Sequence, residues 1–253
     1  MSYIDVELNI NGLGIQARYF REDVDGLFLP LLKTLSNMKM KKQGRLIVFL
    51  AAPPGAGKTT LSLFLAQLSE TVKDVVKVQS VGMDGFHFSQ AYIEKHSVIA
   101  GGQSVPMRNV KGSPETYDLQ KLTDSIKRLR DNDVHVRWPV YDRKLHDVVQ
   151  DAVVVDEDIV IIEGNWLLLD EPGWRELWSL CDYSIFVTAE ESMLKERLIQ
   201  RKIAGGLEVE QAAAFYVQSD GVNVVRAVKN RFVSDLELEL GADGGYAKRK
   251  LQC

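Results

Sequence analysis

The sequence predicts an α/β fold in which a mostly parallel sheet of five strands lies between two layers of helices. Short apolar runs alternate along the chain with helical patterns, as in strand–helix–strand units. One such run, residues 46–50, leads through a glycine-bearing loop directly into a helical pattern. The 253 residues are enough for one domain with an appendage. We expect a main domain over residues 44–253 and a small hairpin-and-helix appendage over residues 1–43.

The glycine-bearing loop is the strongest chemical signal in the chain. Residues 46–61 read LIVFLAAPPGAGKTTL, which gives strand, loop and helix start in that order. Such a loop turns backbone N–H groups inward at a helix N-terminus, where an anion is favoured. The pattern is G-x-x-x-x-G-K-[ST] with Ala52 in place of the first glycine. The sequence therefore predicts a nucleotide site formed by Pro54, Gly55, Ala56, Gly57, Lys58, Thr59 and Thr60.

Two residues of this loop have distinct expected roles. Lys58 would reach the β- and γ-phosphates of the nucleotide, and the Thr59 hydroxyl would ligate Mg²⁺. The alternative is a glycine-rich turn followed by a solvated lysine. The order of strand, loop, Lys-Thr and helix favours the phosphate site.

The segment ahead of the loop carries no identifiable chemistry. Asn11-Gly12 separates two partly alternating segments and predicts a hairpin with a type I′ turn. Residues 22–42 predict an amphipathic helix, with Pro30 in its first turn or at its start. We expect this segment to pack against the main domain.

The remaining elements follow from the same alternation. Residues 88–113 have little periodicity, and so long an irregular stretch in a compact domain is usually functional. Asp118 is the expected N-cap of a helix that continues to Arg130. The other predicted strands are 75–81, 134–138, 158–163 and 183–187, the other helices are 60–70, 190–203, 207–218 and 221–231, and the tail 234–250 predicts an edge hairpin.

Acidic side chains follow two of the predicted strands. Asp84 comes directly after strand 75–81, and Glu163 ends strand 158–163. Ligands of a parallel α/β sheet gather at the carboxyl ends of its strands, so both acids are expected beside the loop. Asp84 would accept the proton of an attacking hydroxyl or hold water on Mg²⁺, unless it only caps a turn. Glu163 would organise Mg²⁺ together with Thr59.

Arg197 and Arg201 lie four residues apart and share one face of a predicted helix. Two guanidinium groups there would close over a transferred phosphoryl group as part of a lid around residues 195–220. The alternative is a solvated face with Glu190, Glu191 and Glu196 as partners.

Several segments in this order resemble the P-loop kinases grouped with uridine kinase, phosphoribulokinase and type I pantothenate kinase. The most similar branch is the nucleoside/nucleotide kinase-like, or fructose-transport-system kinase-like, one. The segments that carry the resemblance are APPGAGKTT (52–60), MDGFHF (83–88), KGSPETYDL (111–119), PVYDRKLHD (139–147), IIEGNWLLLDEPGW (161–174), ERLIQRKIAGGL (196–207) and SDGVNVVRAV (219–228). The resemblance implies the three-layer P-loop kinase fold, with Asp84 as general base toward the acceptor and the two arginines in the lid.

The resemblance also implies an acceptor pocket. Tyr141 matches a tyrosine that lines this pocket, and His146 matches a histidine that contacts the substrate in uridine kinases. Arg143 stands where uridine kinases have Phe and the fructose-transport-like branch has Arg. His87, in the segment of Asp84, is expected there too. Asp84-Gly85-Phe86-His87 differs from the D-S-F-Y of uridine kinases, which argues against uridine as the acceptor.

Composition limits the partners. A net charge of −4 and a pI of about 5.7 argue against a non-specific nucleic-acid binder. No apolar run approaches the ~20 residues of a membrane span, and the first residues lack the pattern of a signal peptide. Cys181 and Cys253 form neither a disulfide framework nor a zinc site, so a cytoplasmic protein is expected. A homodimer is left open.

The sequence thus predicts an ATP- and Mg²⁺-dependent kinase that transfers the γ-phosphoryl group to a hydroxyl of a small metabolite. The acceptor would be a sugar, a polyol, a nucleoside or a pantothenate-like alcohol. The alternatives are a nucleotide-binding regulatory protein without transfer activity and an ATPase coupled to motion. Substitution of Lys58 or Asp84 would favour the regulatory protein, and neither residue is substituted.

Overall fold

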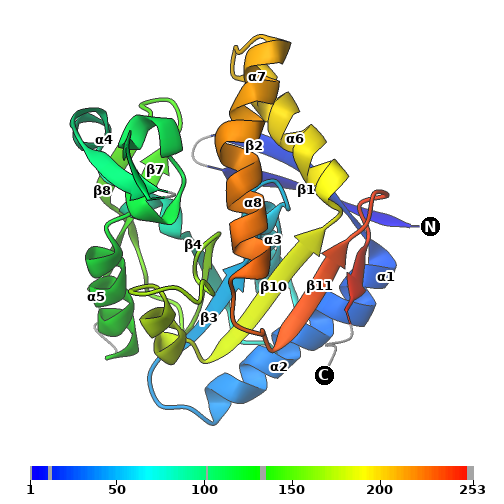
Figure 1. The fold of residues 1–253 in the computed structure, drawn as a ribbon. Coiled ribbons are helices and arrows are strands. Elements are labelled where there is room, and N and C mark those ends of the chain that lie inside the picture. Colours follow the sequence, from blue (N-terminus) through cyan, green and yellow to red (C-terminus); the bar gives the residue numbers. More distant parts are fainter. Residues whose placement is uncertain (1, 11–12, 101, 132–134, 250–253) are drawn as a thin grey trace.

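The computed structural model describes residues 2–10, 13–100, 102–131 and 135–249, and its centre is one six-stranded sheet (Figure 1). The strand order is β12-β11-β10-β3-β9-β4. Neighbours from β11 to β4 are parallel, and the edge strand β12 is antiparallel to β11. The strands are β3 (Leu46–Ala51), β4 (Val78–Gly82), β9 (Ile159–Gly164), β10 (Tyr183–Ala189), β11 (Leu236–Leu240) and β12 (Tyr246–Lys248). The predicted mostly parallel sheet is confirmed, with six strands rather than five.

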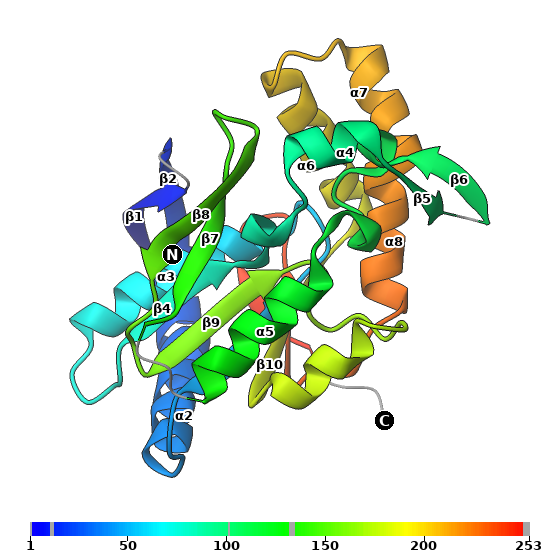
Figure 2. The same ribbon diagram turned by 90° about the vertical axis from the view of Figure 1, so that its left-hand side faces the viewer.

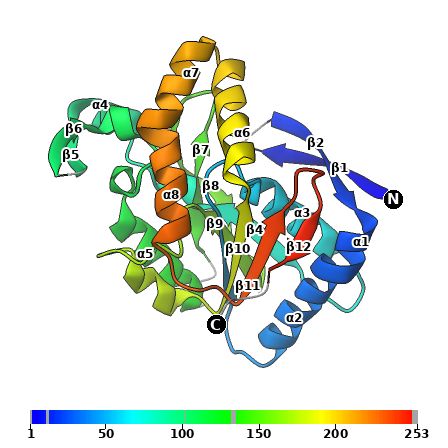
Figure 3. The same cartoon turned by 45° about the vertical axis from the view of Figure 1, so that its right-hand side comes forward.

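Helices cover both faces of this sheet, which confirms the predicted three layers (Figures 1 and 3). Alternate residues of β3 point into two separate cores. Val48 and its neighbours on that face join a core with α2 (Leu29–Met40) and α3 (Lys58–Thr71). Phe49 and its neighbours on the other face join a core with α5 (Leu119–Arg130). Because both faces are covered, β3 is buried along its whole length and its sequence is a continuous apolar run.

Two expectations about the middle of the chain are wrong. The strand expected at 134–138 is β7 (Arg137–Asp142), and it pairs with β8 (Asp147–Val154) in a separate antiparallel arm instead of joining the central sheet (Figure 2). Val134 lies outside the described residues. Residues 88–113 are not irregular throughout, because they contain α4 (Gln90–Lys95) and a hairpin of β5 (Ser97–Ala100) and β6 (Gln103–Pro106). These elements are too short to give a clear periodicity of apolar residues in the sequence.

The front segment forms a hairpin and a helix as predicted. β1 (Tyr3–Ile10) and β2 (Leu13–Phe20) are antiparallel, and the predicted turn at Asn11-Gly12 lies outside the described residues. Helical backbone then runs through α1 (Arg21–Asp23) and a wide π turn, Val24–Phe28, into α2. Pro30 lies in the first turn of α2. Proline has no backbone N–H to donate to the turn before it. The wide π turn ahead of Pro30 accommodates this missing donor.

The elements after β10 match the predicted ranges closely. They are α6 (Glu191–Ala204), α7 (Val209–Phe215), a π turn (Tyr216–Asp220) and α8 (Gly221–Lys229). Strands β11 and β12 form the predicted tail hairpin, and β11 also pairs with β10. Cys253 lies outside the described residues. In the part of the chain that the structure describes, no helix is long and apolar enough to cross a membrane.

Candidate active site

The carboxyl ends of three central strands lie at one level. Ala51 at the end of β3 is opposite Gly164 of β9, and Gly82 at the end of β4 is opposite Glu163 of β9. The loop after β3, the turn after β4 and the acid on β9 therefore meet at one edge of the sheet. Ligands of parallel α/β sheets bind at this edge.

The loop between β3 and α3 has the backbone of a phosphate-binding loop. Gly55 and Gly57 have φ angles of 86° and 81°, a region that favours glycine. Gly57 is the N-cap of the 14-residue α3 and has no side chain to occupy the first N–H groups. The helix N-terminus therefore remains available to an anion.

Lys58, Thr59 and Glu163 form a compact polar group under this loop. The Thr59 hydroxyl donates to Glu163 Oε1 at 2.8 Å, and Lys58 Nζ lies 3.9 Å from Glu163 Oε2. Burial raises the pKa of Glu163 above its ordinary value, although the positive charge of Lys58 opposes the shift. A hydroxyl and one carboxylate match the few protein ligands that Mg²⁺ uses beside water and phosphate oxygens.

Asp84 stands in the 3₁₀ turn Met83–Phe86, directly after β4. The Tyr117 hydroxyl donates to Asp84 Oδ1 at 2.9 Å, and the His87 ring lies on the Tyr117 ring with centroids 3.8 Å apart. Burial by itself raises the pKa of Asp84, but the charge interactions with His87 and Lys58 and the Tyr117 hydrogen bond act against it, and the pKa is lowered. Burial lowers the pKa of His87, while the Asp84 carboxylate opposes that shift. Asp84 is thus held as a carboxylate.

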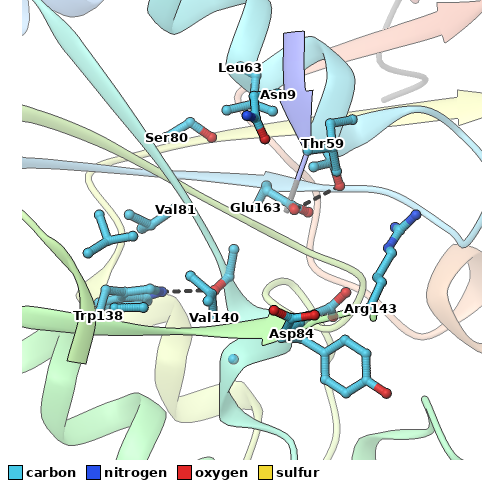
Figure 4. A pocket seen from close by; sticks show the side chains of 17 residues that line it. Asn9, Thr59, Leu63, Ser80, Val81, Asp84, Trp138, Val140, Arg143 and Glu163 are labelled. Atoms are coloured by element: carbon cyan, nitrogen blue, oxygen red, sulfur yellow. Dashed lines mark hydrogen bonds between the residues drawn. The ribbon is translucent and has the colours of Figure 1, made fainter. Parts of the chain in front are cut away.

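Two cavities meet at Asp84. The loop cavity, about 360 Å³, is lined by Ile10, Ile15, Pro54, Gly55, Gly57, Lys58, Thr59, Thr60, Asp84, His87, Lys111, Gly112, Tyr117, Arg143, Asn165, Arg197, Leu198, Arg201, Lys202, Asp220 and Asn223. The arm cavity, about 440 Å³, lies between β4, α3 and the β7–β8 arm. Figure 4 shows Thr59, Asp84, Arg143 and Glu163 at one side of it, with Val81 and Trp138 at the other. Thr59, Asp84 and Arg143 line both cavities.

Most of the site residues expected from the sequence come together here. The loop residues, Asp84, His87, Arg143 and both arginines of α6 line the loop cavity. Ala56, which also belongs to the loop, is fully buried. Tyr141 and Glu163 line the arm cavity. His146 does not join them, because it is exposed in the turn between β7 and β8 with a φ of 53° and lines neither cavity.

The two arginines of α6 differ in their contacts. Arg197 Nη1 lies 3.4 Å from the carbonyl oxygen of Gly55, which is a weak hydrogen bond to the loop. Both side chains are exposed and both line the loop cavity. They are therefore free to move toward a nucleotide in that cavity.

Several polar residues in or beside the loop cavity were not singled out from the sequence. Lys111 donates from Nζ to the Tyr141 hydroxyl at 2.9 Å, and Trp166 donates to the Gly112 carbonyl at 3.0 Å. The others are Tyr117, Asn165, Lys202, Asp220 and Asn223. All lie in segments that carried the family resemblance, and that clustering was the available signal.

Comparison with known proteins agrees with this geometry. Residues 47–225, well over half of the chain, match the model of the phosphoribulokinase / uridine kinase family. The chain is 43% identical to the protein YggC of Escherichia coli K12, over 95% of this chain and 98% of that protein. It is 28% identical to a pantothenate kinase of Shewanella putrefaciens, over 72% of this chain and 63% of that protein.

One solved structure is similar in both sequence and fold. It is a proposed fructose transport system kinase from a Silicibacter species, with a TM-score of 0.73 and 31% identity, over 84% of this chain and 99% of that chain. The predicted resemblance is confirmed. The chain is an ATP-dependent phosphotransferase that acts on an alcohol group, and it belongs to the phosphoribulokinase / uridine kinase family.

Proposed function

We propose that this protein transfers the γ-phosphoryl group of ATP, with Mg²⁺, to a hydroxyl of a small metabolite, and that Asp84 is the general base. The observation that carries the proposal is the position of Asp84. It lines the same cavity as Lys58, Thr59 and the glycine loop, so an acceptor hydroxyl at its carboxylate faces the γ-phosphate. The negative net charge supports a small-molecule acceptor rather than a nucleic acid. We place the protein in the cytoplasm.

The loop cavity suits a polyphosphate at its loop end. Loop N–H groups and the N-terminus of α3 bind phosphate oxygens, and Lys58 adds a point charge on the β- and γ-phosphates. Thr59 and Glu163 would hold Mg²⁺, which neutralises charge on the transferred group. Arg197 and Arg201 belong to a lid around residues 195–220 and approach from α6. We place this chemistry in a kinase domain, residues 44–253, with residues 1–43 as its appendage.

The reaction needs one proton acceptor. As the acceptor oxygen forms its bond to the γ-phosphorus, the bond to the bridging oxygen of ADP breaks and the hydroxyl proton passes to Asp84. Tyr117 holds the carboxylate through Oδ1, which leaves Oδ2 for the hydroxyl. The lowered pKa of Asp84 keeps it ready to accept at neutral pH. The acceptor pocket is proposed to include His87, Tyr141 and Arg143.

The direct test is a phosphorylation screen of alcohols with ATP and Mg²⁺. ADP formation is measured with each alcohol and compared with the background without acceptor. We expect at least one small alcohol to raise ADP formation well above that background and to appear as a phosphate ester. If the protein binds ATP tightly but no alcohol raises ADP formation, the regulatory protein without transfer activity is the better account.

A further inference from the structure

We infer that the acceptor is a polyhydroxylated molecule, a sugar or polyol, and that Asp220 and Asn165 bind hydroxyls other than the one that is phosphorylated. This rests on the proposed function and adds a substrate class to it. Both residues line the loop cavity, as do Lys111 and Gly112, and Asp220 directly precedes α8 (Gly221–Lys229; Figure 1).

Each of these two residues has a buried oxygen that no described residue partners. Asp220 Oδ2 and Asn165 Oδ1 are buried and receive no hydrogen bond from the described residues. Asp220 is 7% exposed, and it lines the loop cavity. Buried polar atoms are normally paired, and leaving one unpaired is unfavourable. A ligand that brings donors to these oxygens removes that cost.

The local backbone holds Asp220 in this position. It is the last residue of the π turn Tyr216–Asp220, and Asn223 follows three residues later on the same face. The Asn223 amide nitrogen lies 4.0 Å from the point where a Cβ on Gly112 would stand. The missing side chain at Gly112 leaves room beside Asn223 for a ligand. Burial raises the pKa of Asp220, while Lys202 and Arg201 oppose the shift.

The two unpartnered oxygens require hydrogen-bond donors, and the surrounding charges favour neutral donors over cationic ones. Six cationic side chains line the loop cavity against two acids: Lys58, Lys111, Arg143, Arg197, Arg201 and Lys202 against Asp84 and Asp220. Three of these cations, Lys58, Arg197 and Arg201, are assigned to the ATP phosphates, and the other three still disfavour an acceptor with an ammonium group. Hydroxyl groups donate to Asp220 and Asn165 and also accept from Lys111 and Asn223. A molecule with several hydroxyls matches both kinds of group.

The first test compares acceptor classes in the wild-type protein. The panel contains D-fructose, D-ribose, D-mannitol and glycerol beside uridine, pantothenate and ethanol, each with ATP and Mg²⁺. We expect turnover of at least one sugar or polyol, with a kcat/KM at least about 10-fold above that of uridine and pantothenate. Failure of every sugar and polyol in the panel overturns this inference. Phosphorylation of uridine or pantothenate would then leave the proposed function intact.

The second test is Asp220→Asn, which keeps the shape of the side chain and removes its charge. We expect KM for the sugar or polyol to rise about 10-fold or more, the scale of one lost hydrogen bond to a charged group, while KM for ATP changes less than twofold. Thermal stability should stay the same or rise, because the variant no longer buries a charge. An unchanged KM for the sugar, or a lower melting temperature as the sole effect, would contradict the assignment.

A control and a binding measurement separate the outcomes further. Asp124→Asn on the exposed face of α5 is the matched control and should change neither KM. Calorimetric titration of the same sugar onto the wild type and Asp220→Asn, with a non-hydrolysable ATP analogue present, reads binding without turnover. If the sugar binds both proteins equally, Asp220 does not hold it. If the wild type binds the sugar but transfers no phosphate to it, the proposed function fails while the binding site stands.

Discussion

At the scale of single residues, the site separates two carboxylates by their surroundings. Glu163 is buried beside Thr59, and burial raises its pKa. The pKa of Asp84 is lowered although burial opposes the shift, because His87, Lys58 and the Tyr117 hydrogen bond together stabilise the charged carboxylate. Pairs of acids whose pKa values are driven apart commonly divide the roles in an active site. In the proposed reaction the acid with the lowered pKa, Asp84, would receive the acceptor, and Glu163 lies beside the Thr59 hydroxyl of α3.

Lys58→Ala should abolish measurable transfer and weaken ATP binding strongly. The variant removes the point charge on the β- and γ-phosphates, and loss of one such stabilising group typically costs 10²-fold or more in rate. It also leaves Glu163 without its nearest cation. Titration with ATP and steady-state kinetics on a preparation of unchanged melting temperature check the prediction. Wild-type turnover in this variant would remove the phosphate-loop interpretation.

Gly85→Ala should destabilise the protein, because a Cβ at this position would stand 2.1 Å from the carbonyl oxygen of Pro139. The backbones of the Asp84 turn and of β7 would have to separate, at a cost of about 2 kcal/mol or more. Gly26→Ala is the control, since a Cβ at Gly26 meets no atom within 4 Å, and it should be neutral or slightly stabilising. Denaturant unfolding of both variants measures the difference. Equal stability of the two would show that β7 does not pack as described.

At the scale of elements, α6 presents its two arginines to the loop cavity. Replacement of Arg197 or Arg201 by Lys keeps the charge but removes the planar group that binds two phosphate oxygens. We therefore expect kcat to fall more than KM for ATP rises. Arg175→Lys, in a surface ion pair with Asp170, is the control and should change neither constant. An effect limited to thermal stability would support a solvated helix face instead.

A cluster of charges fixes α8 to the rest of the domain. Arg226 donates to both carboxylate oxygens of Glu171 and pairs with Glu115 at 2.8 Å. Hydrogen bonds from Arg226 lower the pKa of Glu171. Burial raises the pKa of Glu115, but the hydrogen bonds from Arg226 and Ser113 act against it, and the pKa is lowered. A lowered carboxyl pKa stabilises the fold above the ordinary value near 4.5, and this contribution is lost as the pH falls through the lowered pKa.

Arg226→Met should therefore lower the free energy of unfolding by about 1–3 kcal/mol at pH 7, since it leaves two partly buried acids unpaired. The difference from the wild type should shrink as the pH falls below about 4.5, because both acids then become protonated in either protein. Chemical unfolding from pH 3.5 to pH 7.5 measures this. Arg175→Met is the exposed control, with an expected change within about 0.5 kcal/mol. A difference that does not depend on pH would contradict the ion-pair account.

At the scale of the whole molecule, the front segment shares a core with the central sheet. Tyr19 of β2 stacks on Phe64 of α3 with ring centroids 3.8 Å apart, and Leu32 and Leu35 of α2 are fully buried. Ile10 at the end of β1 lines both cavities. The segment thus both covers one face of the sheet and forms part of the wall of the site.

Local sequence patterns predict much of this architecture. The run of β3, the loop that follows it and the Asp118 cap of α5 are each specified by neighbouring residues, and all are confirmed. The pairing of β7 with β8 was not predicted, because strand pairing depends on tertiary packing. Here Gly85 packs closely against Pro139 of β7. That Asp220 and Asn165 line the same cavity was also not predicted, since more than fifty residues separate them in the sequence. The short strands β5 and β6 left too little pattern to predict.

The central claim is that Asp84 takes the proton of the acceptor hydroxyl, and Asp84→Asn tests it most directly. Asn keeps the shape of the side chain and still accepts from Tyr117, but it is not a base. The measurement is transfer of labelled γ-phosphate from ATP to the alcohol found in the screen, on protein whose melting temperature and ATP affinity match the wild type. We predict that kcat and kcat/KM fall together by roughly 10²-fold or more. Wild-type kcat in this variant would contradict the account and make His87 the first candidate for the base.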